Sequence, residues 1–540
     1  MNEPRSVDLS DFAARQQALA GWQPVEAPPS GLIYRSRGRI LLIGGETALL
    51  YAPRLLPELQ PQVLVTDDSD EPSVPSIPLA GRSLSVDGHL GQFRVELGQP
   101  GERDHEIIGC DIILDLAPQP QLQRDLPPPG YYRPGDEPLV LDALIEELKS
   151  LRGEFEKPKF FVYDPAACAH ARSGVAGCNR CIEACPAEAI SDAGDGIEVN
   201  PMLCQGGGTC AAVCPSGAIG YALPTSIDLQ ERIRQLIRRY RELGGQRPVL
   251  LLQAEAHALP VERLSAQVLP VVVEELASVG LELLLGALAY GAGGLRYLEH
   301  PGLPPKSRQV IDEQMRLMQA LLSAQGYDPE LIGWMTMDEA PLDVEYRLPA
   351  SFVPANFAAL GDKRQRLFQA IDHLHGQAPK RPPSVSLEAG APFGTVTISE
   401  QRCTLCQACT SACPAGALQA AGEQPGIRFI EASCLQCGIC TATCPEDAIW
   451  TSPRLLFDRN ARREARMLHQ EPPFACVRCG KPFATRRIID TVLERLQGNP
   501  MFATEQARQR LQMCEDCRVI DMAHSDPEQL TGQPLELDHD

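Results

Sequence analysis

Aromatic residues make up only 5% of this 540-residue sequence, and just three tryptophans are present. Because aromatic side chains dominate large apolar cores, their scarcity favours small, loop-rich modules that something else holds together. No apolar run is long enough to cross a bilayer. Met1 to Trp22 has neither a secretory apolar segment nor the paired arginines of an export signal. We therefore expect a soluble, cytoplasmic protein in which clustered cysteines stay reduced and bind metal.

Positive charge is scarce as well, because 49 lysines and arginines face 70 aspartates and glutamates, for a net charge of −21. This balance disfavours a nucleic-acid partner, whose phosphates need a cationic surface. It suits docking onto basic protein surfaces, or simply solubility. The sequence also has no Ser–His–Asp pattern, no HExxH and no G-x-G-x-x-G, which leaves no recognisable catalytic motif.

Cysteine is absent from Pro215 to Arg402, although the chain has 20 cysteines. Apart from the isolated Cys110, they form three groups: seven from Cys168 to Cys214, eight from Cys403 to Cys444, and four from Cys476 to Cys517. Three metal-bearing segments are therefore expected between cysteine-free ones.

The second group repeats the pattern C-x2-C-x2-C-x3-C-P, beginning at Cys403 and again at Cys434. Three thiolates two residues apart let one tight loop hold three irons of a cubane, and the fourth cysteine reaches the neighbouring cluster. A pair of zinc sites would need neither the third cysteine nor the proline. The predicted ligand sets are Cys403, Cys406, Cys409 and Cys444 for one [4Fe–4S] cluster, and Cys434, Cys437, Cys440 and Cys413 for the other. Residues Phe393–Ser452 resemble bacterial two-cluster ferredoxins.

The first group repeats this pattern imperfectly. Val175 stands where the first ligand is expected, but Cys168 lies seven residues upstream on a glycine-containing loop that could return it to the same iron. In the second half, Gly207 replaces the second ligand. Crossed assignment gives a full [4Fe–4S] set of Cys168, Cys178, Cys181 and Cys214, and an incomplete set of Cys185, Cys204 and Cys210. Three thiolates indicate a [3Fe–4S] cluster or a [4Fe–4S] cluster with water or another side chain on the fourth iron; the alternative is a lost cluster with packed cysteines.

The third group consists of two C-x2-C pairs, Cys476 with Cys479 and Cys514 with Cys517. Gly480 permits the left-handed bend of a knuckle after the first pair. Four such cysteines suit a closed structural zinc site. A single rubredoxin-like iron or a fifth iron–sulfur cluster are the alternatives. Apolar residues at helical spacing predict a helix over Ile488–Leu496 between the pairs.

The segments without clustered cysteines have an α/β pattern. Strands are predicted at Arg39–Gly45 and Val63–Thr66, in a domain that either binds a nucleotide or is purely structural. Further along, we predict helices at Ser226–Leu243, Val271–Val279 and Gln309–Ala324. Strands are predicted at Val249–Leu252 and Leu281–Leu285, and the alternation suggests a small parallel sheet.

The predicted fold class is α+β multidomain. The expected parts are an N-terminal α/β domain (1–123), a linker and helix (124–157), the imperfect dicluster module (158–224), an α/β domain (225–345), a helix and linker (346–392), the regular module (393–452) and a zinc-ribbon-like four-cysteine module (453–540). Within the central domain, Val268–Met335 is similar to the delta subunit of methyl-viologen-reducing hydrogenase, through Val268-Leu-Pro, Glu274-Glu275 and Gly326-Tyr-Asp-Pro. That family places two-iron-cluster cysteines here; this sequence has none, so the resemblance implies fold and partners only.

These observations favour a polyferredoxin that relays single electrons between cytoplasmic redox partners, such as a formate dehydrogenase or a hydrogenase system. The cofactors expected are three [4Fe–4S] clusters, one [3Fe–4S] or incompletely ligated [4Fe–4S] cluster, and zinc. This set is more typical of an electron carrier than of an enzyme with its own substrate site. One alternative is an oxidoreductase subunit with a flavin in the N-terminal α/β region. Another is a maturation factor that carries clusters as cargo and docks through its four-cysteine module.

Overall fold

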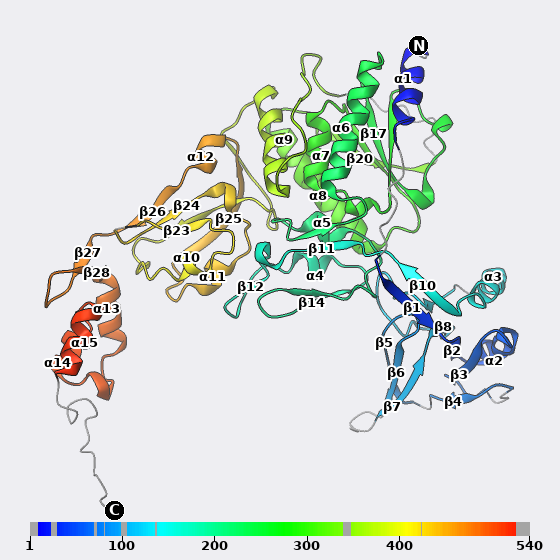
Figure 1. Cartoon of the computed structure of the whole chain (residues 1–540), viewed down its shortest axis with the longest axis horizontal. Coiled ribbons are helices and arrows are strands. Elements are labelled where there is room, and N and C mark those ends of the chain that lie inside the picture. Colours follow the sequence, from blue (N-terminus) through cyan, green and yellow to red (C-terminus); the bar gives the residue numbers. More distant parts are fainter. Residues whose placement is uncertain are drawn as a thin grey trace, which may run out of the picture. The chain divides into compact units, whose positions relative to one another are not determined.

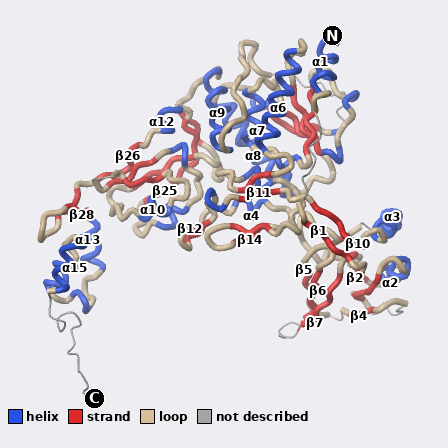
Figure 2. The backbone as a smooth tube through the Cα atoms, viewed as in Figure 1, coloured by secondary structure: helices blue, strands red, loops and turns tan. Residues whose placement is uncertain are grey.

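The structure, a computed structural model, describes residues 9–22, 30–69, 73–79, 81–98, 105–134, 138–337, 347–422 and 424–524 (Figures 1 and 2). Expectations for 1–8, 23–29, 70–72, 80 and 99–104 of the N-terminal domain, for 135–137 of the linker, for 338–345 of the central α/β domain, for 346 and 423, and for 525–540 of the last module lie outside these residues. Within them, no helix combines the length and apolar character that a bilayer crossing needs. The chain forms two compact units. One comprises Met1–Ala166 and Asn179–Arg381, and the other Ala167–Cys178 and Pro382–Asp540.

The first unit begins with a five-stranded sheet in the order β4-β3-β2-β8-β9. The predicted strands are present as β2 (Arg39–Gly44) and β3 (Gln60–Val65), which pair in parallel. Their runs of isoleucine, leucine and valine are buried, as expected for parallel strands covered on both faces. The other elements are α1 (Leu9–Leu19), β1 (Leu32–Ser36), α2 (Glu46–Tyr51), β4 (Ser76–Pro78), β5 (Ser83–Asp87), β6 (Phe93–Gly98), β7 (His105–Cys110), β8 (Ile112–Asp115), β9 (Tyr131–Tyr132), α3 (Pro138–Leu148) and β10 (Gly153–Lys157).

The same unit contains a four-stranded sheet, β18-β17-β19-β20, whose neighbouring strands all run parallel, as predicted. Its strands are β17 (Val249–Ala254), β18 (Val268–Val273), β19 (Leu295–Leu298) and β20 (Ile332–Met335). Its helices are α6 (Ser226–Glu242), α7 (Leu281–Ala289), α8 (Pro305–Ala324) and α9 (Lys363–Gln377), and the short turn η5 (Leu276–Ser278) follows β18.

Two predictions in this region were wrong. Residues 271–273 belong to a strand rather than a helix, and Leu281–Leu285 belong to α7 rather than to a strand. All nine residues of α7 are buried, so the sequence does not show the amphipathic pattern of a helix with an exposed face. A short apolar run without that pattern cannot be told from a buried strand. The helices predicted at Ser226 and Gln309 are confirmed as α6 and α8.

The imperfect dicluster segment places most of its elements in the first unit. Strand β11 (Phe161–Tyr163) pairs with β16 (Ile219–Tyr221), and β14 (Ile190–Asp192) pairs with β15 (Ile197–Val199). Two short helices, α4 (Arg180–Ala184) and α5 (Thr209–Val213), lie between them in the chain. The hairpin formed by β12 (Ala171–Arg172) and β13 (Val175–Ala176) belongs to the second unit.

The second unit repeats this arrangement in the regular module. Strand β22 (Gly394–Ile398) pairs with β25 (Ile449–Leu456), and β23 (Leu418–Ala420) pairs with β24 (Gly426–Phe429). The helices are α10 (Ala408–Ala412) and α11 (Ile439–Thr443). The remaining elements are β21 (Ser384–Ser386), η8 (Glu431–Ser433), α12 (Arg459–Arg463), β26 (Arg466–Gln470), β27 (Pro473–Ala475), β28 (Pro482–Thr485), α13 (Arg486–Arg495), α14 (Glu505–Arg510) and α15 (Glu515–Ala523). The helix predicted at Ile488–Leu496 is confirmed as α13.

Candidate iron–sulfur and metal sites

Each cysteine loop of the regular module bends through two left-handed residues. In the loop 403–409 these are Leu405 and Gln407, with φ of 57° and 65°. In the loop 434–440 they are Gln436 and Gly438, with φ of 54° and 84°. Alternating right- and left-handed residues turn successive backbone N–H groups toward the inside of a loop, which favours an anion there. Both loops therefore have a shape that suits a negatively charged iron–sulfur cluster.

The eight cysteines of the regular module surround two cavities. One is lined by Cys403, Cys406, Cys409 and Cys444. The other is lined by Cys413, Cys434, Cys437 and Cys440. These are the two groups that crossed ligation predicts, because the fourth cysteine of each half lies beside the loop of the other half. The ligation itself stays a prediction.

One buried thiol in each cavity resists ionisation when no positive charge is present. Burial and the neighbouring thiolates, Cys440 among them, raise the pKa of Cys409 to about 12. The same causes raise the pKa of Cys440 to about 12. Four thiolates can share one cavity only if a polycationic core compensates their charge. The donor set therefore fits an iron–sulfur cluster, in which iron supplies that charge.

The incomplete half of the imperfect module keeps the same loop shape. Gly206 and Gly208 have φ of 79° and 73°, at the positions that match Gln436 and Gly438 when Cys204 is aligned with Cys434. Gly207, which stands where the ligand is missing, faces Pro186, because a Cβ built on it would lie 3.4 Å from Cγ of the proline. The loop has thus lost one thiolate but not the backbone turn that holds a cluster.

The three remaining thiols lie near one another. Burial, followed by the charges of Cys204, Cys185 and Cys181, raises the pKa of the Cys210 thiol well above the usual value. Burial likewise raises the pKa of Cys204, and Cys185 adds to the effect. The structure thus brings together the three cysteines predicted for the incomplete cluster. The four cysteines predicted for the complete cluster of this module are divided between the units. Cys168 and Cys178 belong to the second unit, and Cys181 and Cys214 belong to the first. This ligand set stays a prediction.

Two lysines that the sequence patterns did not predict lie beside the incomplete site. The Nζ atom of Lys157 donates hydrogen bonds to the carbonyl oxygens of Pro201, at 2.8 Å, and Cys204. The Nζ atom of Lys363 donates to the carbonyl oxygens of Ala211 and Ala212, at 2.6 and 2.7 Å, at the C-terminal end of α5. Cations suit a helix C-terminus, and positive charge near a cluster stabilises its reduced form. Both lysines lie too far from these cysteines in the sequence for any local pattern to predict the contacts.

Within the second unit, the loop that carries Cys178 lies against the regular module. A Cβ built on Gly177 would lie 2.5 Å from Cγ1 of Ile439, so only glycine allows this approach. Burial and the charges of nearby thiolates, Cys178 among them, raise the pKa of Cys437 to about 11. Cys178 is therefore an electrostatic neighbour of the second cavity of the regular module.

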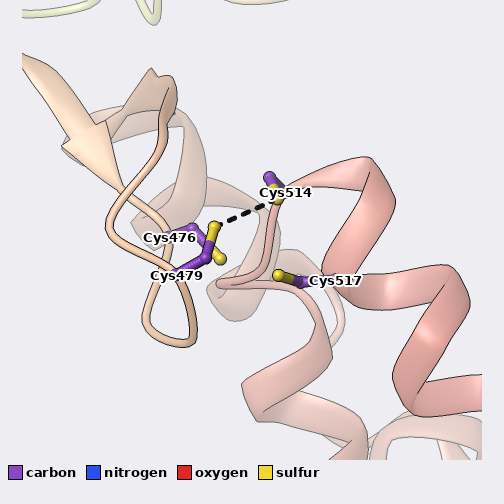
Figure 3. A group of neighbouring side chains, drawn as sticks. All are labelled: Cys476, Cys479, Cys514 and Cys517. Atoms are coloured by element: carbon purple, nitrogen blue, oxygen red, sulfur yellow. Dashed lines mark hydrogen bonds between the residues drawn. The ribbon is translucent and has the colours of Figure 1, made fainter.

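The four C-terminal cysteines converge on one point (Figure 3). All four Sγ atoms lie within 4.8 Å of one another, and those of Cys479 and Cys514 are 3.7 Å apart. A tetrahedral zinc site with Zn–S bonds of about 2.3 Å has S–S edges of about 3.8 Å. The residues therefore fit a tetrahedral metal site, and the metal identity stays a prediction.

The two cysteine pairs of this site lie on different secondary structures, a hairpin and the start of a helix. Strands β27 and β28 form the hairpin of the first pair, and Gly480 has a φ of 75°, the predicted left-handed bend. The second pair begins helix α15 rather than forming a second hairpin, with Cys514 as N-cap. Burial opposes ionisation of Cys476, but hydrogen bonds from the backbone N–H groups of Cys514 and Cys479 outweigh it and lower the pKa of this thiol to about 6.

Comparisons with known proteins agree with this geometry. Two separate segments, residues 402–449 and residues 152–218, each match a family model described as 4Fe-4S dicluster domain, and the two models are different. Hydrogenase-4 component A of Escherichia coli (strain K12) is 42% identical over 55 residues, which make up 10% of this chain. The chain spans about a quarter, 24%, of the length of that curated relative. This mixed α/β chain thus carries two 4Fe-4S dicluster domains and, beyond them, a four-cysteine site.

Proposed function

We propose that this chain is a polyferredoxin-type subunit that relays single electrons between protein redox partners. The observation that carries the proposal is the adjacency of the two cysteine-lined cavities in the regular module. Cys409 lines one cavity and Cys440 the other, yet the charge of Cys440 raises the pKa of Cys409. When bound, iron–sulfur clusters accept and return one electron each, so neighbouring cavities form a path for electrons.

One of the two cavities has an exposed cysteine, and the other has a further cysteine beside it. Cys406 is exposed while Cys403 and Cys409 are buried, so the first cavity has one ligand where a partner can dock. On the other side, Cys178 is the neighbour of Cys437. If Cys178 ligates a cluster, as predicted, that cluster has one ligand beside the second cavity.

We propose a hydrogenase or formate dehydrogenase as one partner. Support comes from the similarity to hydrogenase-4 component A and from the resemblance of Val268–Met335 to a hydrogenase delta subunit. The net charge of −21 favours docking onto a basic surface near the partner's own cluster. The proposed cofactors are three [4Fe–4S] clusters, one [3Fe–4S] or incompletely ligated [4Fe–4S] cluster, and zinc at the C-terminal site.

The test uses the full-length chain purified without oxygen. It is mixed under hydrogen with a catalytic amount of hydrogenase, or under argon with formate and formate dehydrogenase, and the bleaching of its visible absorbance is followed. We expect bleaching that requires the enzyme. Cys406→Ser should slow it, whereas Cys110→Ser, which removes a buried cysteine outside the motifs, should not. A brown protein that dithionite reduces but neither enzyme reduces would contradict the proposed partner, and a protein without iron would contradict electron transfer itself.

A further inference from the structure

One position beside the second cysteine group of the regular module carries a different side chain in the imperfect module. Thr451 lies seven residues after Cys444 and lines the cavity formed by Cys413, Cys434, Cys437 and Cys440. Tyr221 lies seven residues after Cys214 and occupies the same position in the imperfect module. The module that has lost a thiolate at Gly207 thus has a much larger, hydroxyl-bearing side chain at the matching place.

The Tyr221 hydroxyl is buried and unsatisfied. The residue is 5% exposed, and its oxygen has no hydrogen-bond partner among the described residues. A tyrosine hydroxyl is a hydrogen-bond donor near neutral pH. Its charged neighbours are Glu274, Glu275, Cys204 and Cys210, so two thiols of the incomplete site are near it, on the same unit of the chain.

The ring of Tyr221 is fixed in place. It stacks on Phe160, with ring centroids 6.5 Å apart and an interplanar angle of 18°. Phe160 also supports the cysteine loop, because a Cβ built on Gly206 would lie 2.7 Å from the phenylalanine ring. Phe160 thus lies against both the ring of Tyr221 and the cysteine loop.

A buried donor without an acceptor is rare in native proteins, and it often marks the place of a bound ion or cofactor. Building on the proposed electron-transfer function, we propose that the Tyr221 hydroxyl donates a hydrogen bond to a sulfur atom of the cluster held by Cys185, Cys204 and Cys210, and thereby raises its reduction potential. Hydrogen bonds to the sulfurs are one of the factors that set cluster potentials. Such a bond stabilises the more negative, reduced state, and no proton is transferred.

The test is a redox titration of the full-length protein, followed by EPR, in wild type and Tyr221→Phe. We expect the EPR signal of the three-cysteine site to titrate at a lower potential in the variant, by about tenfold in the reduction equilibrium, which is about 59 mV for one electron. The regular module should be unaffected. The matched control is Tyr297→Phe, which removes another buried hydroxyl of the same unit that has no hydrogen-bond partner in the described part of the chain and whose charged neighbour is Glu282. This variant should change no potential.

A second variant covers the case in which Tyr221→Phe loses the cluster. An ortho-fluorinated tyrosine placed at position 221 keeps the ring and makes the hydroxyl a stronger donor, so the potential should rise above that of wild type. Unchanged potentials in both variants would overturn the assignment. So would a tyrosinate-to-iron charge-transfer band in wild type, because Tyr221 would then be a ligand. If the three-cysteine site holds no cluster while the regular module holds two, this inference fails but the electron-relay function stands.

Discussion

Glu431 offers the sharpest test of how the protein fixes a cluster loop. Its carboxylate accepts hydrogen bonds from Nε and a terminal nitrogen of Arg454 at 2.8 and 2.7 Å. A terminal nitrogen of Arg466 lies 3.7 Å away. The Glu431 backbone oxygen also accepts from the N–H of Cys434 at 3.2 Å. This residue therefore ties the start of one cysteine loop to β25 and β26, and Glu431→Gln should loosen that loop.

The size of the effect follows from the burial of the three groups. The Glu431 side chain is 3% exposed, but those of Arg454 and Arg466 are 34% and 40% exposed. Breaking a fully buried ion pair costs about 3–5 kcal/mol, and water at the arginines reduces this cost. We estimate about 2–3 kcal/mol, which corresponds to about 30- to 160-fold.

The assay is the rate at which visible absorbance disappears in urea without oxygen, with EPR to show which cluster leaves first. We expect the Glu431→Gln protein to release the cluster of Cys434 faster, by up to the factor given above, and to keep the other clusters longer. The control is Glu505→Gln, which breaks an exposed pair with Arg508 and should change the rate little. Equal rates in both variants and wild type would refute the reasoning.

Three further predictions concern other parts of the chain. The Gly208→Ala protein should lose the three-cysteine cluster, because the new Cβ would lie 2.4 Å from Cβ of Ser278. The control Gly194→Ala should keep it, because Gly194 has a similar φ of 82° but nothing within 4 Å of the new Cβ. EPR and iron content distinguish the two variants. Chelation should remove one metal ion per chain, assayed by mass spectrometry, and unfold the region around α13 and α15 while the brown colour persists. Acid extraction should release no flavin; a flavin spectrum would favour the oxidoreductase-subunit alternative.

Local patterns in the sequence account for the parts of the sites that depend on short-range spacing. The repeated cysteine motifs predicted the two groups that line the cavities of the regular module. The glycines at 206 and 208 are a sequence signal for left-handed positions, because glycine adopts positive φ at no steric cost. Their counterparts Gln436 and Gly438 also carry positive φ in the structure. Spacing is informative here because a cluster constrains the loop that wraps it.

Long-range features were beyond the sequence. Lys157 lies 47 residues from Cys204, whose carbonyl it holds, and Tyr221 had no distinguishing pattern around it. The exchange of helix and strand at 271–285 arose because β18 and α7 are both almost wholly buried, so neither shows the alternation or the amphipathic spacing that separates the two structures.

The proposed electron relay requires thiolates that bind iron and sulfide, and elemental analysis of anaerobically purified protein tests this most directly. Iron and acid-labile sulfide are measured per chain, with EPR of oxidised and reduced samples. From the ligand sets, we predict about 15 irons with a similar amount of sulfide and an oxidised three-iron signal, or about 16 irons if the incomplete site holds four. About eight irons would mean that only the regular module binds clusters. Colourless protein without sulfide would contradict the account.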